Sequence, residues 1–358
     1  MAVVRTIEFI RTSLPLRVPY KLSFGPVRSF DTYLARIELD DGREGWGETT
    51  VLTGYTDETV EETAPNGREI AKAILNLNVE DARKDAYRFH ERAPFAVTSF
   101  MTALDMATGH PLLNSATALK VPVLAIISES EPGPLATEVD GLLARGYRTL
   151  KFKVGFDVRA DLEALATLQS VVAGRANIRV DANQGYSVDE AVAFLSEMSP
   201  QDIELLEQPC AAGDWDAAEE VAKHAHVPLM LDESIFGVED IRRAADLGCA
   251  SFIKLKLMKL CSLDKLCEGL ALIRELGMEP VLGNGVASDI GCWMEACVAA
   301  RYVENAGEMN GFLKPVSPVF DLPLRVEDGC LHVDPGKAIV PDRDEIDRHT
   351  LEHATFPG

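Results

Sequence analysis

Polar and apolar residues follow two different patterns along this chain, and the change between them divides it into two parts. In "DTYLARIELDDGREGWGE", two strand-like runs flank Asp41-Gly42, a pair typical of a hairpin turn. A helical pattern follows from about Asp57 to Met106. These patterns predict an α+β domain over residues 1–115.

From about Val121 onward, short apolar strands alternate with longer amphipathic stretches that have a helical period. The predicted strands are "VPVLAII", "YRTLKFKV", "ANIRVDA", "DIELLEQP", "VPLMLDES", "SFIKLKLM", "MEPVLGNG" and "NAGEMNG". Such a series of strand–helix units predicts a parallel barrel with its helices outside, over residues 116–317. The strand-like, Pro-rich segment 318–358 is expected to leave the barrel and pack back on the first domain.

Composition and charge restrict the class of partner. The chain has 358 residues, 47% of them hydrophobic, and 57 acidic against 35 basic residues give a net charge of −22. Such a surface would repel nucleic acid and anionic lipid, and no apolar run is long enough to span a membrane. Seven cysteines without CxxC spacing suit a reducing cytoplasm. We therefore expect a cytoplasmic protein that acts on a small molecule.

Acidic residues follow three consecutive predicted barrel strands, at Asp181, Glu207 and Asp232. The carboxyl ends of parallel barrel strands meet at one rim, where barrel enzymes keep their active sites. Each acid alone is explained equally well as the N-cap of the next helix. Three carboxylates at one rim, however, repel each other unless a cation neutralises them, and oxygen ligands without His or Cys suit Mg²⁺. We predict that all three bind Mg²⁺; Glu233 is a secondary candidate, with a side chain expected to point away from that of Asp232.

Lysines end the second and sixth predicted strands, before and after the acids in the sequence. Lys151 and Lys153 are two residues apart, as are Lys254 and Lys256, so each strand turns its pair to the same side. The second and sixth strands of a closed eight-stranded ring are roughly opposite. Lysines on two faces of a metal could take a proton from one face of a carbon and return it to the other. The competing explanation is a set of surface lysines with stems covering the barrel mouth.

These motifs resemble those of the enolase superfamily, in particular its muconate lactonizing enzyme subgroup. The resemblance rests on the KxK of Lys151 and Lys153 and on "VDANQGY", "LLEQP", "LMLDES", "KLMK" and "GWGE". It implies an α/β fold, a (β/α)₇β TIM-like barrel with an N-terminal capping domain, and a substrate carboxylate bound to Mg²⁺. A base would remove the proton α to that carboxylate, and the metal would stabilise the resulting enediolate.

The resemblance also implies roles for individual residues. Lys153 is the expected base, and Lys151 is expected to lower the pKa of Lys153 and to offer positive charge to the intermediate. Lys256 is the expected acid or base on the opposite face. Asp181, Glu207 and Asp232 occupy the positions of the metal ligands.

The chain departs from two neighbouring groups within the superfamily. No His occurs between His226 and His332, so the His–Asp dyad of the mandelate racemase subgroup is excluded. Dipeptide epimerases hold the substrate ammonium with Asp-x-Asp on the eighth strand, where this chain has Glu308-Met309-Asn310. The additional Lys254 suggests either a second anionic or carbonyl group on the substrate, or a stem packed under the barrel mouth.

Further side chains are expected to contact the substrate from the strand ends and from two capping-domain loops, about Arg17–Phe30 and Val51–Thr59. Ser288 is a hydrogen-bonding candidate or a turn residue, and Phe24 is a candidate pocket wall. The other predicted substrate-binding residues are Lys254, Asn183, Asn284, Glu308, Asn310, Tyr20 and Tyr55.

The sequence thus predicts an isomerase that abstracts the α-proton of a small carboxylate substrate with the help of Mg²⁺. Racemisation or epimerisation of an amino-acid-like or N-substituted amino acid is favoured, because both lysines and Glu308 are present. A lyase catalysing β-elimination (a dehydratase, or one resembling o-succinylbenzoate synthase) and a cycloisomerase start from the same intermediate and stay open. More remote alternatives are a Schiff-base aldolase using Lys256 and a non-catalytic binding protein. Relatives usually form dimers or larger rings, so a homo-oligomer is expected.

Overall fold

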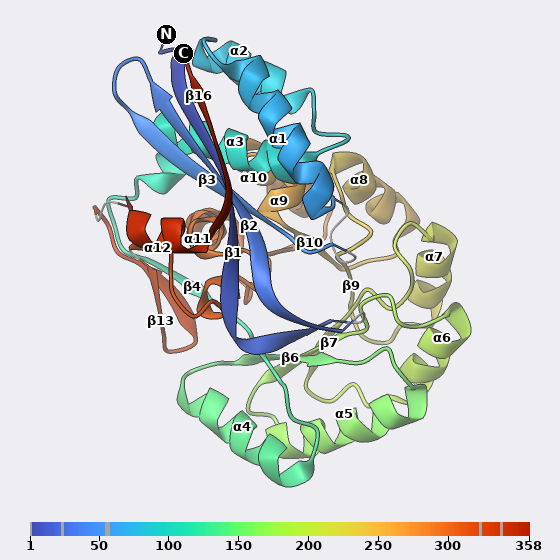
Figure 1. The fold of residues 1–358 in the computed structure, drawn as a ribbon. Helices are drawn as coiled ribbons and strands as arrows, with labels where there is room; N and C mark the ends of the chain where they lie inside the picture. Colours follow the sequence, from blue (N-terminus) through green and yellow to red (C-terminus); the bar gives the residue numbers. More distant parts are fainter. Residues whose placement is uncertain (1, 23–24, 54–57, 322–323, 337–338) are drawn as a thin grey trace.

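A four-stranded antiparallel sheet forms the centre of the N-terminal part of the molecule. The computed structural model describes residues 2–22, 25–53, 58–321, 324–336 and 339–358. The strand order of this sheet is β16-β1-β2-β3, so the last strand of the chain lies beside the first. The two termini lie together at the outer end of this sheet (Figure 1). The bounds are β1 (Val4–Leu22), β2 (Gly25–Leu39), β3 (Glu44–Val51) and β16 (Thr350–Pro357).

Three helices follow this sheet: α1 (Val60–Ile74), α2 (Val79–Tyr87) and α3 (Pro94–Ala107). Helix α3 lies directly on β3 because two glycines leave room for it. A Cβ atom at Gly45 or at Gly47 would overlap the backbone carbonyl oxygen of Ala103 or of Ser99 in α3. Because the two glycines of the "GWGE" motif carry no side chain, α3 packs directly against the backbone of β3.

The second part is the predicted parallel barrel. Seven strands are hydrogen-bonded in sequence order, and helices α4 to α8 form an arc outside them (Figure 1). The strands are β5 (Ala125–Ile126), β6 (Thr149–Lys153), β7 (Asn177–Asp181), β8 (Ile203–Glu207), β9 (Leu229–Leu231), β10 (Phe252–Leu255) and β11 (Glu279–Leu282). The helices are α4 (Pro132–Ala144), α5 (Val158–Val172), α6 (Val188–Glu197), α7 (Trp215–His224), α8 (Val238–Leu247), α9 (Leu257–Leu260), α10 (Leu263–Glu275) and α11 (Asp289–Tyr302).

The segment at Gly307 and Glu308 takes the place of the eighth strand. The backbone N–H of Glu308 donates to the carbonyl of Leu282 in β11 (3.0 Å), and the N–H of Leu124 donates to the carbonyl of Gly307 (2.9 Å). This segment thus connects the two edge strands of the sheet, and the (β/α)₇β architecture predicted from the sequence is confirmed. None of the described helices has the length and apolar composition needed to cross a membrane.

The C-terminal segment divides between the two parts of the molecule. Strands β13 (Leu324–Glu327) and β14 (Cys330–Val333) form a small sheet with β4 (Leu119–Pro122), which precedes the barrel. Helix α12 (Arg343–His349) leads into β16, which completes the N-terminal sheet. Only the last part of this segment therefore pairs with the capping sheet. The remaining short elements are η1 (Pro111–Leu113), η2 (Gly311–Leu313), β12 (Phe320–Asp321) and β15 (Val340–Pro341).

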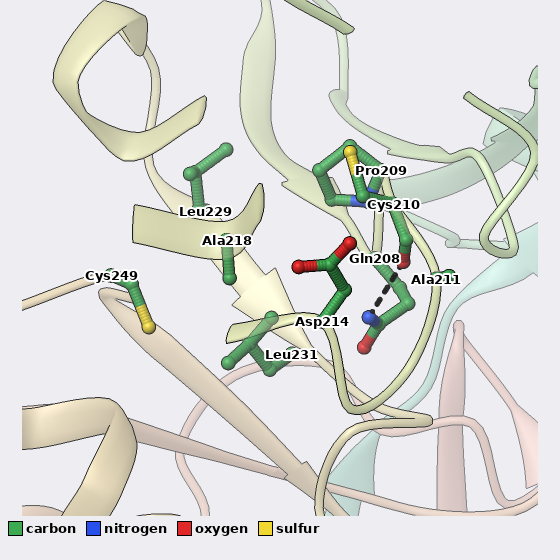
Figure 2. A pocket seen from close by; sticks show the side chains of 9 residues that line it. All are labelled: Gln208, Pro209, Cys210, Ala211, Asp214, Ala218, Leu229, Leu231 and Cys249. Atoms are coloured by element: carbon green, nitrogen blue, oxygen red, sulfur yellow. Dashed lines mark hydrogen bonds between the residues drawn. The ribbon is translucent and has the colours of Figure 1, made fainter. Parts of the chain in front are cut away.

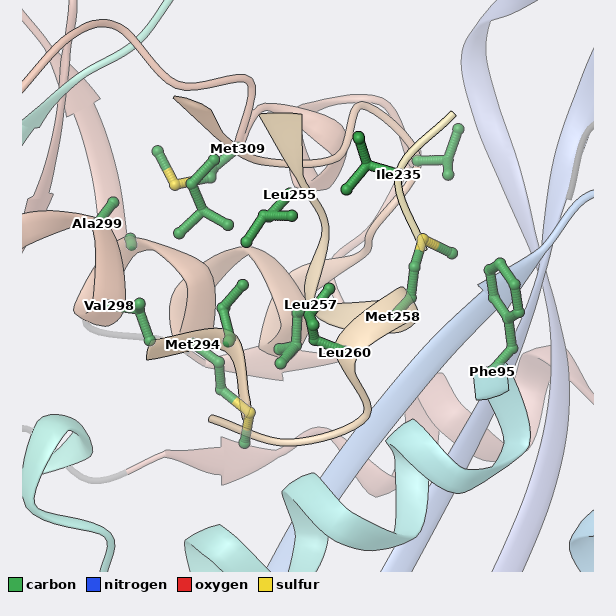
Figure 3. Close-up of a cluster of buried hydrophobic side chains, with 14 of the residues drawn as sticks. Phe95, Ile235, Leu255, Leu257, Met258, Leu260, Met294, Val298, Ala299 and Met309 are labelled. Carbon is green, nitrogen blue, oxygen red and sulfur yellow. The ribbon is translucent and has the colours of Figure 1, made fainter. Parts of the chain in front are cut away.

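Buried contacts fix the capping domain to the barrel. The carboxylate of Glu48 in β3 accepts hydrogen bonds from the N–H and hydroxyl of Ser288 and from the N–H of Ile290, at the start of α11. The hydroxyl of Thr98 in α3 donates to the carbonyl of Met258 in α9 (3.0 Å). Phe95 of α3 lies beside Met258 at the edge of the apolar cluster under α9 (Figure 3). The capping domain is thus held by both polar and apolar contacts.

Glu295 of α11 is a buried acid that contacts the start of α9. One of its oxygens accepts a hydrogen bond from the N–H of Leu257 at the start of α9 (2.9 Å), and the other, Oε2, is buried and accepts none. Burial raises the pKa of Glu295 to about 7. Because this raised pKa belongs to the folded state, Glu295 stabilises the fold at low pH, and this contribution is lost as the pH rises through 7.

We predict that Glu295→Gln stabilises the protein relative to the native chain as the pH rises from 5.5 to 8. The free energy of unfolding of the variant, minus that of the native chain, should increase by about 1–2 kcal/mol between these two pH values. Glutamine keeps the acceptor for Leu257 and cannot ionise. Urea unfolding at both pH values measures the effect, with Glu275→Gln on the exposed face of α10 as the control. Equal pH dependence in the native and Glu295→Gln proteins would contradict a raised pKa at this residue.

Candidate active site

Three carboxylates lie in a row at the carboxyl ends of neighbouring barrel strands. Asp181 ends β7, Glu207 ends β8, and Asp232 follows β9 directly. The strands are in parallel register, with Asp181 beside Glu207. All three residues are at most 2% exposed. The structure therefore brings the three predicted metal ligands together at one rim.

Two lysine ammonium groups lie between these carboxylates. Lys151 Nζ is 2.8 Å from both Asp181 Oδ2 and Glu207 Oε2. Lys254 Nζ is 3.1 Å from Glu207 Oε1 and 3.3 Å from Asp232 Oδ2. Both lysines are buried, so positive charge from β6 and from β10 neutralises the acids inside the barrel.

The other two lysines lie at the two ends of the row. Lys153 Nζ is 2.5 Å from Asp181 Oδ2, and its side chain is 33% exposed. Lys256 Nζ is 2.7 Å from Asp232 Oδ1. Since β6 and β10 are separated by the three strands that carry the acids, these two amines approach the site from different directions.

Burial and charge act against each other in setting the pKa values of the acids. Burial alone would raise the pKa of Asp181, but Lys151, Lys153 and Lys254 outweigh it and lower that pKa to about 2. The pKa of Asp232 also lies well below its usual range, because Lys256 and Lys254 outweigh burial. At Glu207, burial and the charge of Asp181 prevail, and the pKa is raised.

The buried lysines are held in their charged form. Burial opposes the charge of Lys151, but Asp181, Glu207 and Glu308 outweigh it and hold its pKa well above the usual value. The pKa of Lys256 is also raised, because Asp232 outweighs burial. Lys256 therefore carries a proton that it could donate.

The chemistry of the oxygen atoms suits a hard divalent cation. Glu207 Oε2 and Asp232 Oδ1 are buried and lie 2.8 and 2.7 Å from the ammonium groups of Lys151 and Lys256, whereas Glu233 Oε2 is buried and accepts no hydrogen bond. Across the described ranges, no set of three or more His, Cys, Asp or Glu side chains is already arranged to hold a metal ion. The donor set thus fits Mg²⁺ in type, and binding requires the ammonium groups between the carboxylates to move.

Asn183 connects Lys153 to a fourth acid. Its Oδ1 accepts a hydrogen bond from Lys153, and its Nδ2 donates to Glu233 Oε1 (2.7 Å). Burial, followed by the charges of Asp232 and Asp181, raises the pKa of Glu233 to about 7. Glu233 therefore belongs to the same polar network through Asn183, and the backbone at Asn183 has a positive φ of 42° that places its side chain there.

Glu308 lies on the inner side of the cluster. Its Oε2 is 2.9 Å from Lys151 Nζ and accepts a hydrogen bond from Lys254. Burial would raise the pKa of Glu308, but these two lysines hold it well below the usual range. Asn310, two residues later, has a side-chain oxygen that is buried and accepts no hydrogen bond.

Tyr20 lies at the boundary between the capping domain and the barrel, beside Lys314, which the sequence analysis did not identify. Lys314 Nζ is 4.3 Å from the centre of the Tyr20 ring and donates to the carbonyl of Gly285. A Cβ atom at Gly285 would lie 2.9 Å from Glu308 Oε1, 3.2 Å from Lys314 Nζ and 3.5 Å from the Tyr20 hydroxyl. These three polar groups therefore surround the space left by Gly285.

Arg17 connects β1 to the same region, because its guanidinium group donates hydrogen bonds to the carbonyls of residues 315 and 316.

Two predicted substrate-binding side chains are used inside the protein. Asn284 is buried, its amide group donates to the Met258 sulfur, and its oxygen accepts from the N–H of Val286 (3.1 Å). The hydroxyl of Ser288 donates to Glu48 (2.7 Å). Contacts of either residue with a substrate stay predictions. Tyr55 and Phe24 lie outside the described residues.

Gln208 holds two of the acid-bearing strands together and was not identified from the sequence. Its Oε1 accepts hydrogen bonds from the N–H groups of Asp232 (3.0 Å) and Ser234 (3.2 Å), and its Nε2 donates to Cys210 and Ser234. Behind it, between β8, β9 and α7, lies a cavity of only about 10 Å³, room for at most one water molecule (Figure 2). The position of Gln208 next to Glu207 in "LLEQP" was the only signal in the sequence.

Comparison with known proteins identifies the family. The family model described as "Enolase C-terminal domain-like" matches residues 134–345. The model described as "Mandelate racemase / muconate lactonizing enzyme, N-terminal domain" matches residues 4–126. The chain therefore belongs to the mandelate racemase / muconate lactonizing enzyme family, which is part of the enolase superfamily. The resemblance seen in the sequence motifs is thereby confirmed.

Individual relatives are similar over most of their length. L-Ala-D/L-Glu epimerase of Clostridium acetobutylicum is 28% identical over an alignment 296 positions long that covers 78% of this chain and 82% of the relative. N-succinyl-L-Arg/Lys racemase of Bacillus cereus is 25% identical over an alignment 374 positions long, gaps included, that covers 98% of each chain. The crystal structure of N-succinyl Arg/Lys racemase from Bacillus cereus has a TM-score of 0.90 at 22% identity, covering 99% of this chain and 100% of that one.

A dipeptide epimerase from Cytophaga hutchinsonii, solved with Mg and the dipeptide D-Ala-L-Val, shares the fold. Its TM-score is 0.88 at 20% identity, and the match covers 99% of both chains. The relatives named above are epimerases and a racemase, which are isomerases. The prediction of an isomerase from the sequence is confirmed.

We predict that Gln208→Ala lowers the free energy of unfolding by about 2–4 kcal/mol, because two buried backbone N–H groups lose their acceptor. Urea unfolding measures this loss. Gln184→Ala is the matched control, since Gln184 is exposed and accepts one hydrogen bond, from Ala212 (2.8 Å). Equal losses in the two variants would show that Gln208 does not hold β8 and β9 together.

Proposed function

We propose that the protein is a racemase or epimerase that removes the α-proton of a carboxylate substrate and returns it to the opposite face. The observation that carries this proposal is the placement of Lys153 and Lys256 at opposite ends of the row of buried carboxylates. A single base can remove a proton, but inversion of the carbon is simplest with a second acid on the other face. The similarity to epimerases and a racemase supports the proposal.

Asp181, Glu207 and Asp232 are the residues that would hold Mg²⁺. When bound, Mg²⁺ would supply positive charge that makes the proton α to the substrate carboxylate more acidic and stabilises the enediolate. The burial of carboxylates from three neighbouring strands at one rim supports this assignment. A related fold has been solved with Mg, in a dipeptide epimerase.

The lysines would divide the proton transfers between them. Lys153 is the more exposed of the two and would take the α-proton as the base, with Asn183 fixing its position. Lys256, held protonated beside Asp232, would deliver a proton to the other face. Lys151 is buried among three carboxylates and would contribute positive charge rather than transfer a proton.

The state of Glu308 favours an N-acylated amino acid over one with a free ammonium group. A substrate ammonium needs an anion with negative charge to spare, and Glu308 is already neutralised by Lys151 and Lys254. An N-acyl group carries no positive charge and needs no such partner. The relative that acts on N-succinyl amino acids, similar along 98% of each chain, is consistent with this choice.

Lys314 and Tyr20 would bind the end of the N-acyl group. Lys314 provides an ammonium group close to the space beside Gly285, and Tyr20 provides a hydroxyl. Both groups can donate hydrogen bonds to a carbonyl or carboxylate. The site would therefore accept an acyl group that ends in an oxygen acceptor.

The first test follows the α-proton in deuterated solvent. Native protein with Mg²⁺ should exchange the α-proton of N-acyl amino acids of both configurations, as measured by ¹H NMR. Lys153→Ala and Lys256→Ala should each lower racemisation at least about 10³-fold, because one of the two proton carriers is lost, while Mg²⁺ binding persists. Lys120→Ala, at an exposed lysine of β4, is the control.

Three results would argue against this function. Near-normal racemisation by either lysine variant would refute the two-base assignment. Loss of a β-substituent from the substrate, or closure of a ring, would identify a lyase or a cycloisomerase. Exchange without any dependence on Asp181, Glu207 or Asp232 would refute the proposed metal site.

A second test concerns the acyl end. Lys314→Met should raise KM about 10-fold or more for N-succinyl amino acids, because the partner of the terminal carboxylate is lost. For N-acetyl amino acids, which end in a methyl group, KM should change less than about 3-fold. Steady-state racemisation of both substrates measures the contrast, and equal changes in KM would contradict a role for Lys314 in binding the acyl end.

We also propose that the protein is cytoplasmic and forms a homo-oligomer. All seven cysteines are free thiols, as expected in a reducing compartment. Light scattering coupled to size-exclusion chromatography would give the mass in solution. A mass of one chain, 39.0 kDa, would refute the oligomer.

A further inference from the structure

Lys254 lies between two oxygens that the proposed function assigns to a metal ion. It is on β10, where it faces the barrel interior with Lys256, and it is only 3% exposed. Its Nζ is 3.1 Å from Glu207 Oε1 and 3.3 Å from Asp232 Oδ2. An ammonium group thus occupies the space between two of the three proposed metal ligands.

A third partner of Lys254 is not one of those ligands. Glu308 Oε2, from the segment that closes the barrel, accepts a hydrogen bond from Lys254 Nζ. Glu308 is buried and is also ion-paired with Lys151. Lys254 can therefore lose its contacts with Glu207 and Asp232 and still keep a buried carboxylate as its partner.

A divalent cation at Glu207 and Asp232 would come close to the ammonium of Lys254. Like charges at such short range repel strongly in a buried site, where water screens them little. Lys254 pairs with one oxygen of Glu207 and one of Asp232, and the second oxygen of each acid is paired with Lys151 or Lys256. Cation and ammonium therefore cannot both keep the geometry seen here.

We propose that Lys254 competes with the divalent cation for Glu207 and Asp232, and that it is retained by Glu308 alone when the cation binds. The inference rests on the proposed metal site and extends it. Lys254 keeps the acids neutralised in the metal-free protein, and it lowers the affinity for the cation below that of the same three carboxylates without it.

The test measures Mg²⁺ binding directly, by isothermal titration calorimetry with MgCl₂ at constant ionic strength. Lys254→Met removes the charge and keeps a side chain of similar length. We expect this variant to bind Mg²⁺ at least about 10-fold more tightly than the native chain, because the competing cation is gone. Lys120→Met, which removes one exposed positive charge from β4, should bind as the native chain does.

Removal of Lys254 leaves Glu308 and Glu207 with fewer partners, so the metal-free variant should also melt at a lower temperature. Saturating MgCl₂ should raise its Tm by more than it raises the Tm of the native chain. If Lys254→Met does not fold, Lys254→Gln keeps a hydrogen-bond donor for Glu308 without the charge, and the same tighter binding is expected.

The outcomes separate this inference from the proposed function. Unchanged or weaker Mg²⁺ binding in a folded Lys254 variant would overturn the competition. If the native chain bound no measurable Mg²⁺, the variant should gain binding, and failure to gain it would overturn the inference as well. Mg²⁺ binding that persists in Asp181→Asn and Asp232→Asn would instead refute the proposed metal site. Tighter Mg²⁺ binding by Lys254→Met could then not be explained by competition for Glu207 and Asp232.

Discussion

The structure depends on the burial of many charges of both signs at one end of a barrel. Four acids and four lysines meet there, and most are almost completely removed from water: Asp181, Glu207, Asp232, Glu308, Lys151, Lys153, Lys254 and Lys256. Each isolated charge would be costly to bury, and only mutual pairing makes the set tolerable. Catalytic potential and stability therefore rest on the same ion pairs.

The fold supplies the positions that this pairing requires. Parallel strands in register put Asp181 next to Glu207, and Gln208 fixes the backbone of Asp232 behind them. The capping domain is anchored by the buried Glu48 at the start of α11. Hydrogen bonds thus hold both the acid-bearing strands and the capping domain in place around the site.

Much of this arrangement can be predicted from the sequence, because strand periodicity and the ends of parallel strands are local features. The barrel, the capping domain, the row of three acids and the two flanking lysines all follow from them. What the sequence does not reveal depends on contacts between distant segments. Lys254 pairs with Glu308, 54 positions later, and Lys314 meets Tyr20 of the capping domain. No local pattern indicates either contact.

The same limit applies to the substrate-binding predictions. Asn284 follows the seventh barrel strand as expected, yet its side chain bonds to Met258 and Val286 within the protein. Glu308 is at the predicted place, but its charge is already balanced by two lysines. Position along a strand can be predicted, whereas the partner that a buried polar group finds is decided by packing in three dimensions.

The central claim is that one divalent cation joins the three carboxylates while amines stand on either side of the substrate. Anomalous diffraction from crystals grown with Mn²⁺ and an N-acyl amino acid tests it most directly. The account predicts a single strong peak bonded to Asp181, Glu207 and Asp232, with Lys153 and Lys256 facing opposite sides of the α-carbon. A peak elsewhere, or no peak while lysines still bridge the three acids, would contradict it.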